Sequence, residues 1–306
     1  MKRLLTAALA ALTLLLPAAG CGDSAGPSAS DDTFTVLTSF APIYALTCNV
    51  ADGVPGVEVV NMAASGTGCL HDYQLTTADM RKVEAADVFV INGGGMESFM
   101  DKVFSADRDK TVIDTSEGVT LLESGGAGED GDHDHDHAQN PHIWLSVRNA
   151  MQQVRNIRDG LKETDPDHAA DYERNAAAFL EQLEALDAEY TEGLRNVRTR
   201  DIMTFHEAFD YLAHDYGLRV VAVVTAEPGV SPDPKTLQGL IDTVKEKKIT
   251  AIFDEPQYDN ATARLIAENT GAKQYTLDPL VTGEMTKDSY LRVMRENLDT
   301  LRQALA

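Results

Sequence analysis

Positive charge is scarce in this sequence. Its 306 residues include 26 Lys and Arg against 49 Asp and Glu, which gives a formal net charge of −23. A nucleic-acid backbone would be repelled and no basic stripe offsets the excess, so the composition argues against nucleic-acid binding. Hydrophobic residues at 43% and charged residues at 25% are ordinary for a globular chain that buries a core. The length predicts two domains or one large one.

The signatures of several enzyme classes are also missing. There is no Gly-x-Ser-x-Gly motif, and the glycine run over residues 93–95 lacks the spacing of a phosphate-binding loop. His206 and Glu207 begin like the His-Glu-x-x-His motif of zinc hydrolases, but the fifth position is Asp210. Without paired helix ligands a zinc hydrolase is the weaker alternative, and we expect a protein that is not an enzyme.

The only long apolar run lies at the N-terminus. A positively charged start precedes an apolar stretch over residues 4–16, which is too short for a bilayer span of about 20 residues. This pattern predicts a signal peptide over residues 1–20. Its end resembles a bacterial lipobox, which predicts a lipid on Cys21 and a flexible tether over residues 21–32. We therefore expect an extracytoplasmic protein anchored to the cell membrane; simple cleavage and secretion is the alternative.

Cysteine is rare, with three in the whole chain. Once Cys21 is assigned to the lipid, Cys48 and Cys69 remain. In an exported protein such a pair most often forms one disulfide. A metal-binding pair is the alternative, but the spacing matches no zinc motif. We predict a Cys48–Cys69 disulfide that closes a loop ending just before His71.

Short β-branched runs alternate with amphipathic stretches in each half of the chain. This alternation indicates βαβ units and parallel sheets. It predicts an α/β protein of two similar lobes, residues 33–165 and 199–306, each with a parallel four-stranded sheet. The predicted strands are 33–37, 57–60, 88–91, 111–114, 202–205, 220–224, 250–253 and 274–277, and the predicted helices include 77–85, 97–104, 207–216, 234–247, 261–269 and 289–304.

One long helix is predicted to join the two lobes. Residues 168–198 contain no proline and a single glycine, and apolar residues recur there at steps of three and four. At about 1.5 Å per residue, roughly thirty residues would span about 45 Å. We assign residues 166–198 to this linking helix and expect it to limit hinge motion. Its apolar stripe is Tyr172, Ala176, Phe179, Leu183, Leu186, Tyr190, Leu194 and Val197.

A Gly-rich segment and a His/Asp tract interrupt the first lobe. Residues 124–131 lead into alternating Asp and His over residues 132–137, a composition that cannot bury a core. We predict a mobile loop over residues 124–138 that captures metal weakly and passes it on. A solvated linker with incidental binding is the alternative. The histidines concerned are His133, His135 and His137.

Four other candidate ligands lie near the ends of predicted strands or in the loops that follow them. In open α/β sheets, ligands bind at the carboxyl ends of strands, where loops from different strands converge. Three imidazoles and one carboxylate are the donor set of a tetrahedral zinc site. Because these residues lie tens of positions apart, their spacing in the sequence cannot show that they meet. Their placement near strand ends only makes a common site possible. The four are His71, His142, His206 and Asp278.

Motifs around these residues follow one another in order along the chain. They are CLHDYQL at 69–75, NPHIWL at 140–145, TFHEAFDY at 204–211, IFDEPQ at 252–257 and LDPL at 277–280.

With these motifs the sequence resembles the substrate-binding lipoproteins of zinc and manganese ABC transporters over nearly all of the mature chain. The resemblance implies that His71, His142, His206 and Asp278 hold one metal ion between the lobes. It also implies that an ABC permease and its ATPase are the partners, with a monomeric binding protein delivering the metal.

The third histidine favours zinc as the metal. In the resembled family a His at this position goes with zinc and a Glu with manganese, and this chain has His206. Imidazole suits zinc, whereas manganese favours oxygen ligands. Glu255, at a strand end, is expected to orient a ligand histidine from behind. A protein for manganese or another divalent metal, or an adhesin on the same fold, is the alternative.

Overall fold

The computed structural model describes residues 33–64, 66–70, 73–106, 109–124, 139–224, 232–283 and 285–306. Residues Thr33–Ala306 form one compact unit. The predicted signal peptide, Cys21 and the tether lie outside the described residues, as does residue range 125–138 of the predicted His-rich loop. No helix within the described ranges is both long and apolar enough to cross a bilayer.

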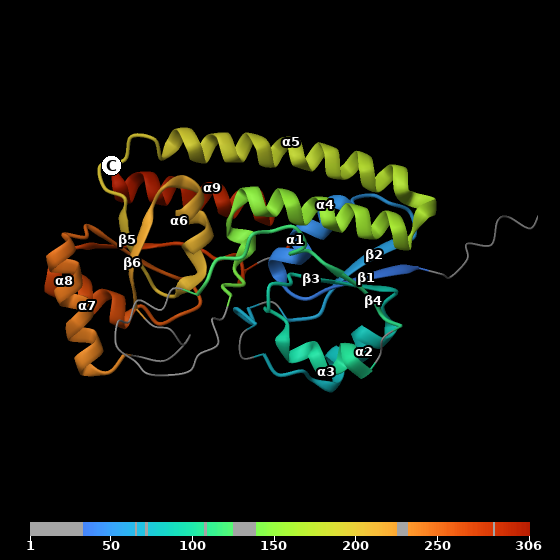
Figure 1. The fold of residues 1–306 in the computed structure, drawn as a ribbon, viewed down its shortest axis with the longest axis horizontal. Helices are drawn as coiled ribbons and strands as arrows, with labels where there is room; N and C mark the ends of the chain where they lie inside the picture. The colour runs from blue at the N-terminus through green and yellow to red at the C-terminus, as the bar shows by residue number, and fades with distance from the viewer. Residues whose placement is uncertain are drawn as a thin grey trace, which may run out of the picture. The chain divides into compact units, whose positions relative to one another are not determined.

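A parallel sheet in the order β2-β1-β3-β4 forms the first lobe (Figure 1). β1 pairs with both β2 and β3, so the order of strands reverses there. The central strand β3 is buried along its whole length, which fits its uninterrupted apolar sequence VFVI. The strands are β1 (Phe34–Thr38), β2 (Val57–Asn61), β3 (Val88–Ile91) and β4 (Thr111–Asp114).

The second lobe repeats this topology in the order β6-β5-β7-β8, again with every pair parallel. The prediction of two similar lobes, each with a parallel four-stranded sheet, is confirmed. Each predicted strand lies within one residue of the observed strand at both ends. The strands are β5 (Asp201–Thr204), β6 (Arg219–Val223), β7 (Ala251–Asp254) and β8 (Lys273–Thr276).

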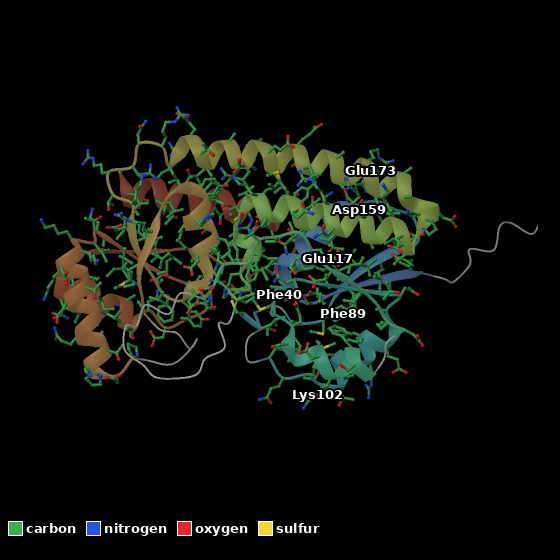
Figure 2. The ribbon with its side chains drawn as sticks, in the orientation of Figure 1. Phe40, Phe89, Lys102, Glu117, Asp159 and Glu173 are labelled. Atoms are coloured by element: carbon green, nitrogen blue, oxygen red, sulfur yellow. The ribbon has the colours of Figure 1, made fainter. Side chains whose placement is uncertain are left out.

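Helices cover both faces of each sheet (Figure 1). In the first lobe α2 and α3 pack on the face that carries Phe89, which is labelled in Figure 2. In the second lobe α7 and α8 cover one face, and α9 lies beside the long helix α5. The α-helices are α1 (Ala41–Val50), α2 (Thr77–Ala85), α3 (Asp101–Ala106), α4 (Val147–Thr164), α5 (Ala169–Gly193), α6 (Asp210–Tyr216), α7 (Pro234–Lys247), α8 (Ala261–Thr270) and α9 (Ser289–Leu305). Short 3₁₀ turns, Ser98–Met100, Pro166–His168 and Glu207–Phe209, precede α3, α5 and α6, and Ile143–Leu145 precedes α4.

The predicted linking helix, residues 166–198, corresponds to the 3₁₀ turn Pro166–His168 and to α5, which ends at Gly193, five residues earlier than predicted. Its stripe from Tyr172 to Tyr190 is buried, as the period of three and four requires. α4, which was not predicted, runs alongside it, and ion pairs join the two helices. Arg158 and Lys162 of α4 both lie within 3.4 Å of Glu173 on α5, labelled in Figure 2.

The apolar core is continuous across the two lobes. Val36 and Val88 of the first sheet belong to the same buried cluster as Ile202 and Phe253 of the second. Separating the sheets would expose this surface at a cost of about 25 cal/mol per Å². The shared core opposes a wide hinge opening, and limited hinge motion stays a prediction.

Local signals fix where several helices begin. Thr76 and Asp79 form a reciprocal capping box at α2. Ser146 accepts a hydrogen bond from the amide of Asn149 at α4, and Asp233 caps α7 with Pro234 in its first turn.

Candidate metal centre

The site is assembled at the carboxyl ends of strands from both lobes. His206 follows β5, which has partners on both sides in its sheet, and Glu255 follows the neighbouring β7. His142 belongs to the segment between β4 and α4, and Cys69 to the segment between β2 and α2. Residues from four connections therefore meet where parallel strands end, the usual ligand position in such sheets.

Three potential ligand atoms gather there. The Nε2 atoms of His142 and His206 lie 3.2 Å apart, and the Cys69 Sγ lies 3.6 Å from His206 Nε2. All three ligand atoms lie within 4.8 Å of one another. Both histidines are 2% exposed. Of the sequence-predicted ligands, the structure thus brings His142 and His206 together.

Glu255 fixes the orientation of His206. Its Oε1 lies 2.5 Å from His206 Nδ1 and accepts a hydrogen bond from the His206 amide. Its other oxygen accepts from Gln257. Because a carboxylate can only accept, Nδ1 carries a proton and Nε2 is the nitrogen directed at the cluster. Glu255 therefore contacts the histidine that it is expected to orient, and its role beside a bound metal stays a prediction.

Burial alone would lower the pKa of His206, but the Glu255 carboxylate and the contact with Cys69 raise the pKa to about 10. A pKa raised in this way favours the doubly protonated imidazole at neutral pH. The second proton is carried by Nε2, the nitrogen that faces His142 Nε2 and Cys69 Sγ. A metal ion at this place has to displace it.

Asn140 orients His142 in the corresponding way. Its Oδ1 accepts hydrogen bonds from His142 Nδ1 at 2.8 Å and from the His142 amide at 3.0 Å. Its amide nitrogen donates to the Glu207 carbonyl and to Asp210, so the oxygen assignment is fixed by the network. Asn140 is fully buried and ties the first lobe to the second. Sequence reasoning gave it no role.

Aromatic side chains form the surroundings of the two imidazoles. The Trp144 ring lies 5.2 Å from that of His142, and the Tyr258 ring lies edge-on to that of His206 at 5.9 Å. Trp144 also donates its indole N–H to the carbonyl of Pro279, at 2.8 Å. This bond attaches the loop that carries Asp278 to the motif that carries His142.

Asp278 lies outside the cluster of three. It follows β8 as predicted, but its Oδ1 accepts a hydrogen bond from the Leu280 amide, and Asn297 holds its backbone on both sides. Burial raises the pKa of its carboxyl. Its role as a ligand stays a prediction. His71 and the tract residues His133, His135 and His137 lie outside the described residues, so their roles stay predictions as well.

The predicted Cys48–Cys69 disulfide is wrong. Both cysteines are free. Cys48 lies on α1 hydrogen-bonded to the Tyr44 side chain, whereas Cys69 faces His206. The sequence offered a signal for the second arrangement, since Cys69 stands two positions before His71 in the first histidine motif. The disulfide prediction rested only on the number of cysteines that remain in an exported protein, and it did not use this position.

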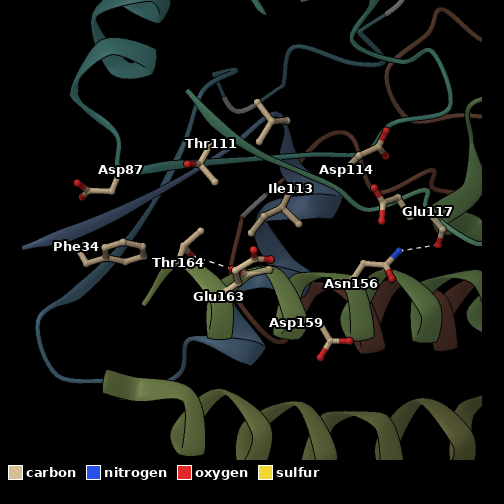
Figure 3. A pocket seen from close by; sticks show the side chains of 12 residues that line it. Phe34, Asp87, Thr111, Ile113, Asp114, Glu117, Asn156, Asp159, Glu163 and Thr164 are labelled. Carbon is tan, nitrogen blue, oxygen red and sulfur yellow. Dashed lines mark hydrogen bonds between the residues drawn. The ribbon is translucent and has the colours of Figure 1, made fainter. Parts of the chain in front are cut away.

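A hollow of about 880 Å³ lies elsewhere, between β4 and the C-terminal half of α4 (Figure 3). Acidic side chains line much of it, but it contains none of the candidate ligands. This hollow is therefore separate from the candidate metal site. The acidic lining residues are Asp87, Asp114, Glu117, Asp159 and Glu163.

The family is decided by a match over residues 36–304 to the model of ZnuA, the periplasmic component A of the zinc-uptake complex. The chain belongs to this family. Among curated relatives of this ZnuA-family chain is the zinc-binding lipoprotein AdcA of Streptococcus pneumoniae, 36% identical over 284 residues. The match covers 90% of this chain and 56% of AdcA, so the chain spans about half the length of the first relatives it matches.

Solved structures place the ZnuA-family chain in the same fold. The binding protein FpvC of Pseudomonas aeruginosa, in complex with Mn²⁺, has a TM-score of 0.80 and 29% identity, covering 89% of this chain and 98% of FpvC. The laminin-binding protein Lmb of Streptococcus agalactiae, described as bifunctional with adhesin and metal-transporting activity, has a TM-score of 0.78 and 30% identity. That match covers 89% of this chain and all of Lmb.

Proposed function

We propose that this chain is the extracytoplasmic substrate-binding component of an ABC metal importer and captures one Zn²⁺ between its lobes. The observation that carries the proposal is the buried pair His142 and His206. Their Nε2 atoms face each other while Asn140 and Glu255 hold both Nδ1 atoms. Metal-binding histidines are commonly held through the second nitrogen in this way.

The donor set supports zinc over manganese. Two imidazoles with a sulfur atom close by form a borderline-to-soft environment, which suits zinc, whereas manganese prefers oxygen. His71 is proposed as the third imidazole. The family resemblance gives Asp278 as the fourth ligand. A relative of this fold binds Mn²⁺, so the choice of metal depends on these side chains and not on the fold.

Delivery completes the proposed function. A lipid on Cys21 would keep the protein, as a monomer, close to a membrane permease whose ATPase drives import. The loop with His133, His135 and His137 would collect zinc when it is scarce. No catalytic role is proposed, because a cluster filled by protein ligands leaves no open position for a reacting water.

The test is zinc content and competitive zinc affinity of His206→Ala, with His214→Ala as the matched control. His214 has a side chain that is 69% exposed and lies on α6. One tight equivalent that is lost in His206→Ala and kept in His214→Ala supports the proposal. Equal zinc affinity in all three proteins would refute the assignment of the site.

A role in adhesion is the second candidate, favoured by the likeness to Lmb. Deleting the gene distinguishes the two. Loss of growth at limiting zinc supports import, whereas loss of surface attachment with normal growth supports adhesion.

A further inference from the structure

Cys69 lies at a distance from His206 that a zinc site requires. With zinc–nitrogen bonds near ~2.05 Å and zinc–sulfur bonds near ~2.3 Å, tetrahedral geometry places two nitrogens about 3.3 Å apart and nitrogen and sulfur about 3.6 Å apart. The observed separations are 3.2 Å between the two Nε2 atoms and 3.6 Å between His206 Nε2 and Cys69 Sγ. Two edges of a tetrahedral N₂S site are therefore already present.

The residues that follow Cys69 anchor its segment of the chain. Leu70, the next residue, is fully buried in the core. The Tyr73 amide donates to the Leu70 carbonyl, and the Tyr73 hydroxyl donates to Asp79 at the start of α2. The imidazoles are fixed independently by Asn140 and Glu255. The three ligand atoms thus converge from separately anchored segments.

We propose that Cys69 is a ligand of the captured zinc, binding as a thiolate beside His142 and His206 and taking the fourth position that the resemblance gives to Asp278. The proposal rests on the proposed function. The described Asp278 carboxylate is outside the cluster and accepts from Leu280, whereas the Cys69 sulfur is inside it. A thiolate makes the site softer, which raises selectivity for zinc against manganese.

Cobalt(II) substitution tests the proposal directly, because a thiolate bound to cobalt gives a near-ultraviolet charge-transfer band that imidazole and carboxylate do not. The full chain is used with Cys21→Ser, so that Cys48 and Cys69 are the only thiols. Cys69→Ser keeps the size and a hydrogen-bonding group, and Cys48→Ser is the matched control. We expect the band in the parent and in Cys48→Ser and its complete loss in Cys69→Ser. Zinc affinity should fall more than about 100-fold in Cys69→Ser. Removing a residue that only orients a ligand typically costs about 10- to 100-fold, so a larger loss indicates a direct ligand.

A second measurement needs no substitution at Cys69. Iodoacetamide labelling followed by peptide mass mapping compares both thiols with and without one equivalent of zinc. Zinc should protect Cys69 and leave the labelling of Cys48 unchanged. Equal labelling of Cys69 in the two states would contradict the proposal.

Failure of this inference differs from failure of the proposed function. If the parent holds one zinc that His206→Ala loses, but shows no charge-transfer band, the importer function stands and Cys69 is not a ligand. The same conclusion follows if Asp278→Asn loses zinc as fully as His206→Ala while Cys69→Ser keeps it. If the parent binds neither zinc nor cobalt, both are wrong.

Discussion

The Nε2 atoms of His142 and His206 lie 3.2 Å apart, with Glu255 behind one ring and Asn140 behind the other. The Cys69 sulfur also faces His206 Nε2, at 3.6 Å. When His206 is protonated, its Nε2 proton is bound to a nitrogen that would bind the metal. The proton and the metal ion therefore compete for His206 Nε2.

This competition predicts a steep pH dependence of zinc affinity. The pKa of His206 is raised to about 10, so the imidazole is protonated below that pH and zinc has to displace one proton. Affinity should rise about tenfold per pH unit between about pH 7 and 9, and more if the Cys69 thiol also releases a proton. Calorimetry in buffers of different ionisation enthalpy counts the protons released. No proton release at pH 7 would show that His206 is neutral before zinc arrives.

Glu255→Gln should flatten this dependence. The amide carries no charge, so it no longer holds the pKa of His206 high, and fewer protons leave when zinc binds at pH 7. Glu268→Gln, on the exposed surface of α8, is the control and should leave the proton count unchanged. An unchanged count in Glu255→Gln would mean that another group supplies the proton.

Asn140→Ala should weaken zinc binding about 10- to 100-fold, because His142 loses the partner that orients its ring. The free energy of unfolding should also fall by about 1–3 kcal/mol, since the partners of a buried amide are left unsatisfied. Competitive zinc titration and urea unfolding measure the two effects. Asn269→Ala, at an exposed position on α8, serves as the control. Full zinc affinity in Asn140→Ala would argue against this orienting role.

Trp144→Phe removes the hydrogen bond to Pro279 together with part of a fully buried ring system. An aromatic ring remains, but the buried Pro279 carbonyl loses its 2.8 Å donor. We expect a loss of about 1–3 kcal/mol in the free energy of unfolding, measured by circular dichroism in urea. Trp144 is the only tryptophan in the chain, so fluorescence cannot follow this variant. A stability equal to the parent protein would show that water replaces the indole donor.

Reducing agent should leave the stability of the protein unchanged. Cys48 and Cys69 are free, so these two cysteines form no disulfide that could be reduced. The thermal midpoint with and without reductant should agree within about 1 °C, whereas losing a native disulfide typically costs about 2–5 kcal/mol. Thiol titration of the unfolded chain provides the count. A thermal midpoint that falls clearly when reductant is added would show that the two cysteines do form a disulfide.

Sequence reasoning succeeded where a feature depends on neighbours along the chain. The period of α5 marks its buried face from Tyr172 to Tyr190, because residues three and four apart share one side of a helix. α4 carried a similar signal in Val147, Ala150, Val154 and Ile157, all buried, and could have been predicted from it. α1 is harder to predict, because its apolar sequence APIYALTCNV shows little contrast between its two faces.

The sequence by itself determined the two α/β halves, the long helix between them and the histidine motifs, since each depends on local periodicity or on a short run of residues. Only the tertiary structure decided that Cys69 belongs beside His206, 137 positions away, and not with Cys48. It also decided that Asn140 of one lobe hydrogen-bonds Asp210 of the other. Such contacts arise when strand ends from separate sheets converge, and no spacing along the chain encodes that distance.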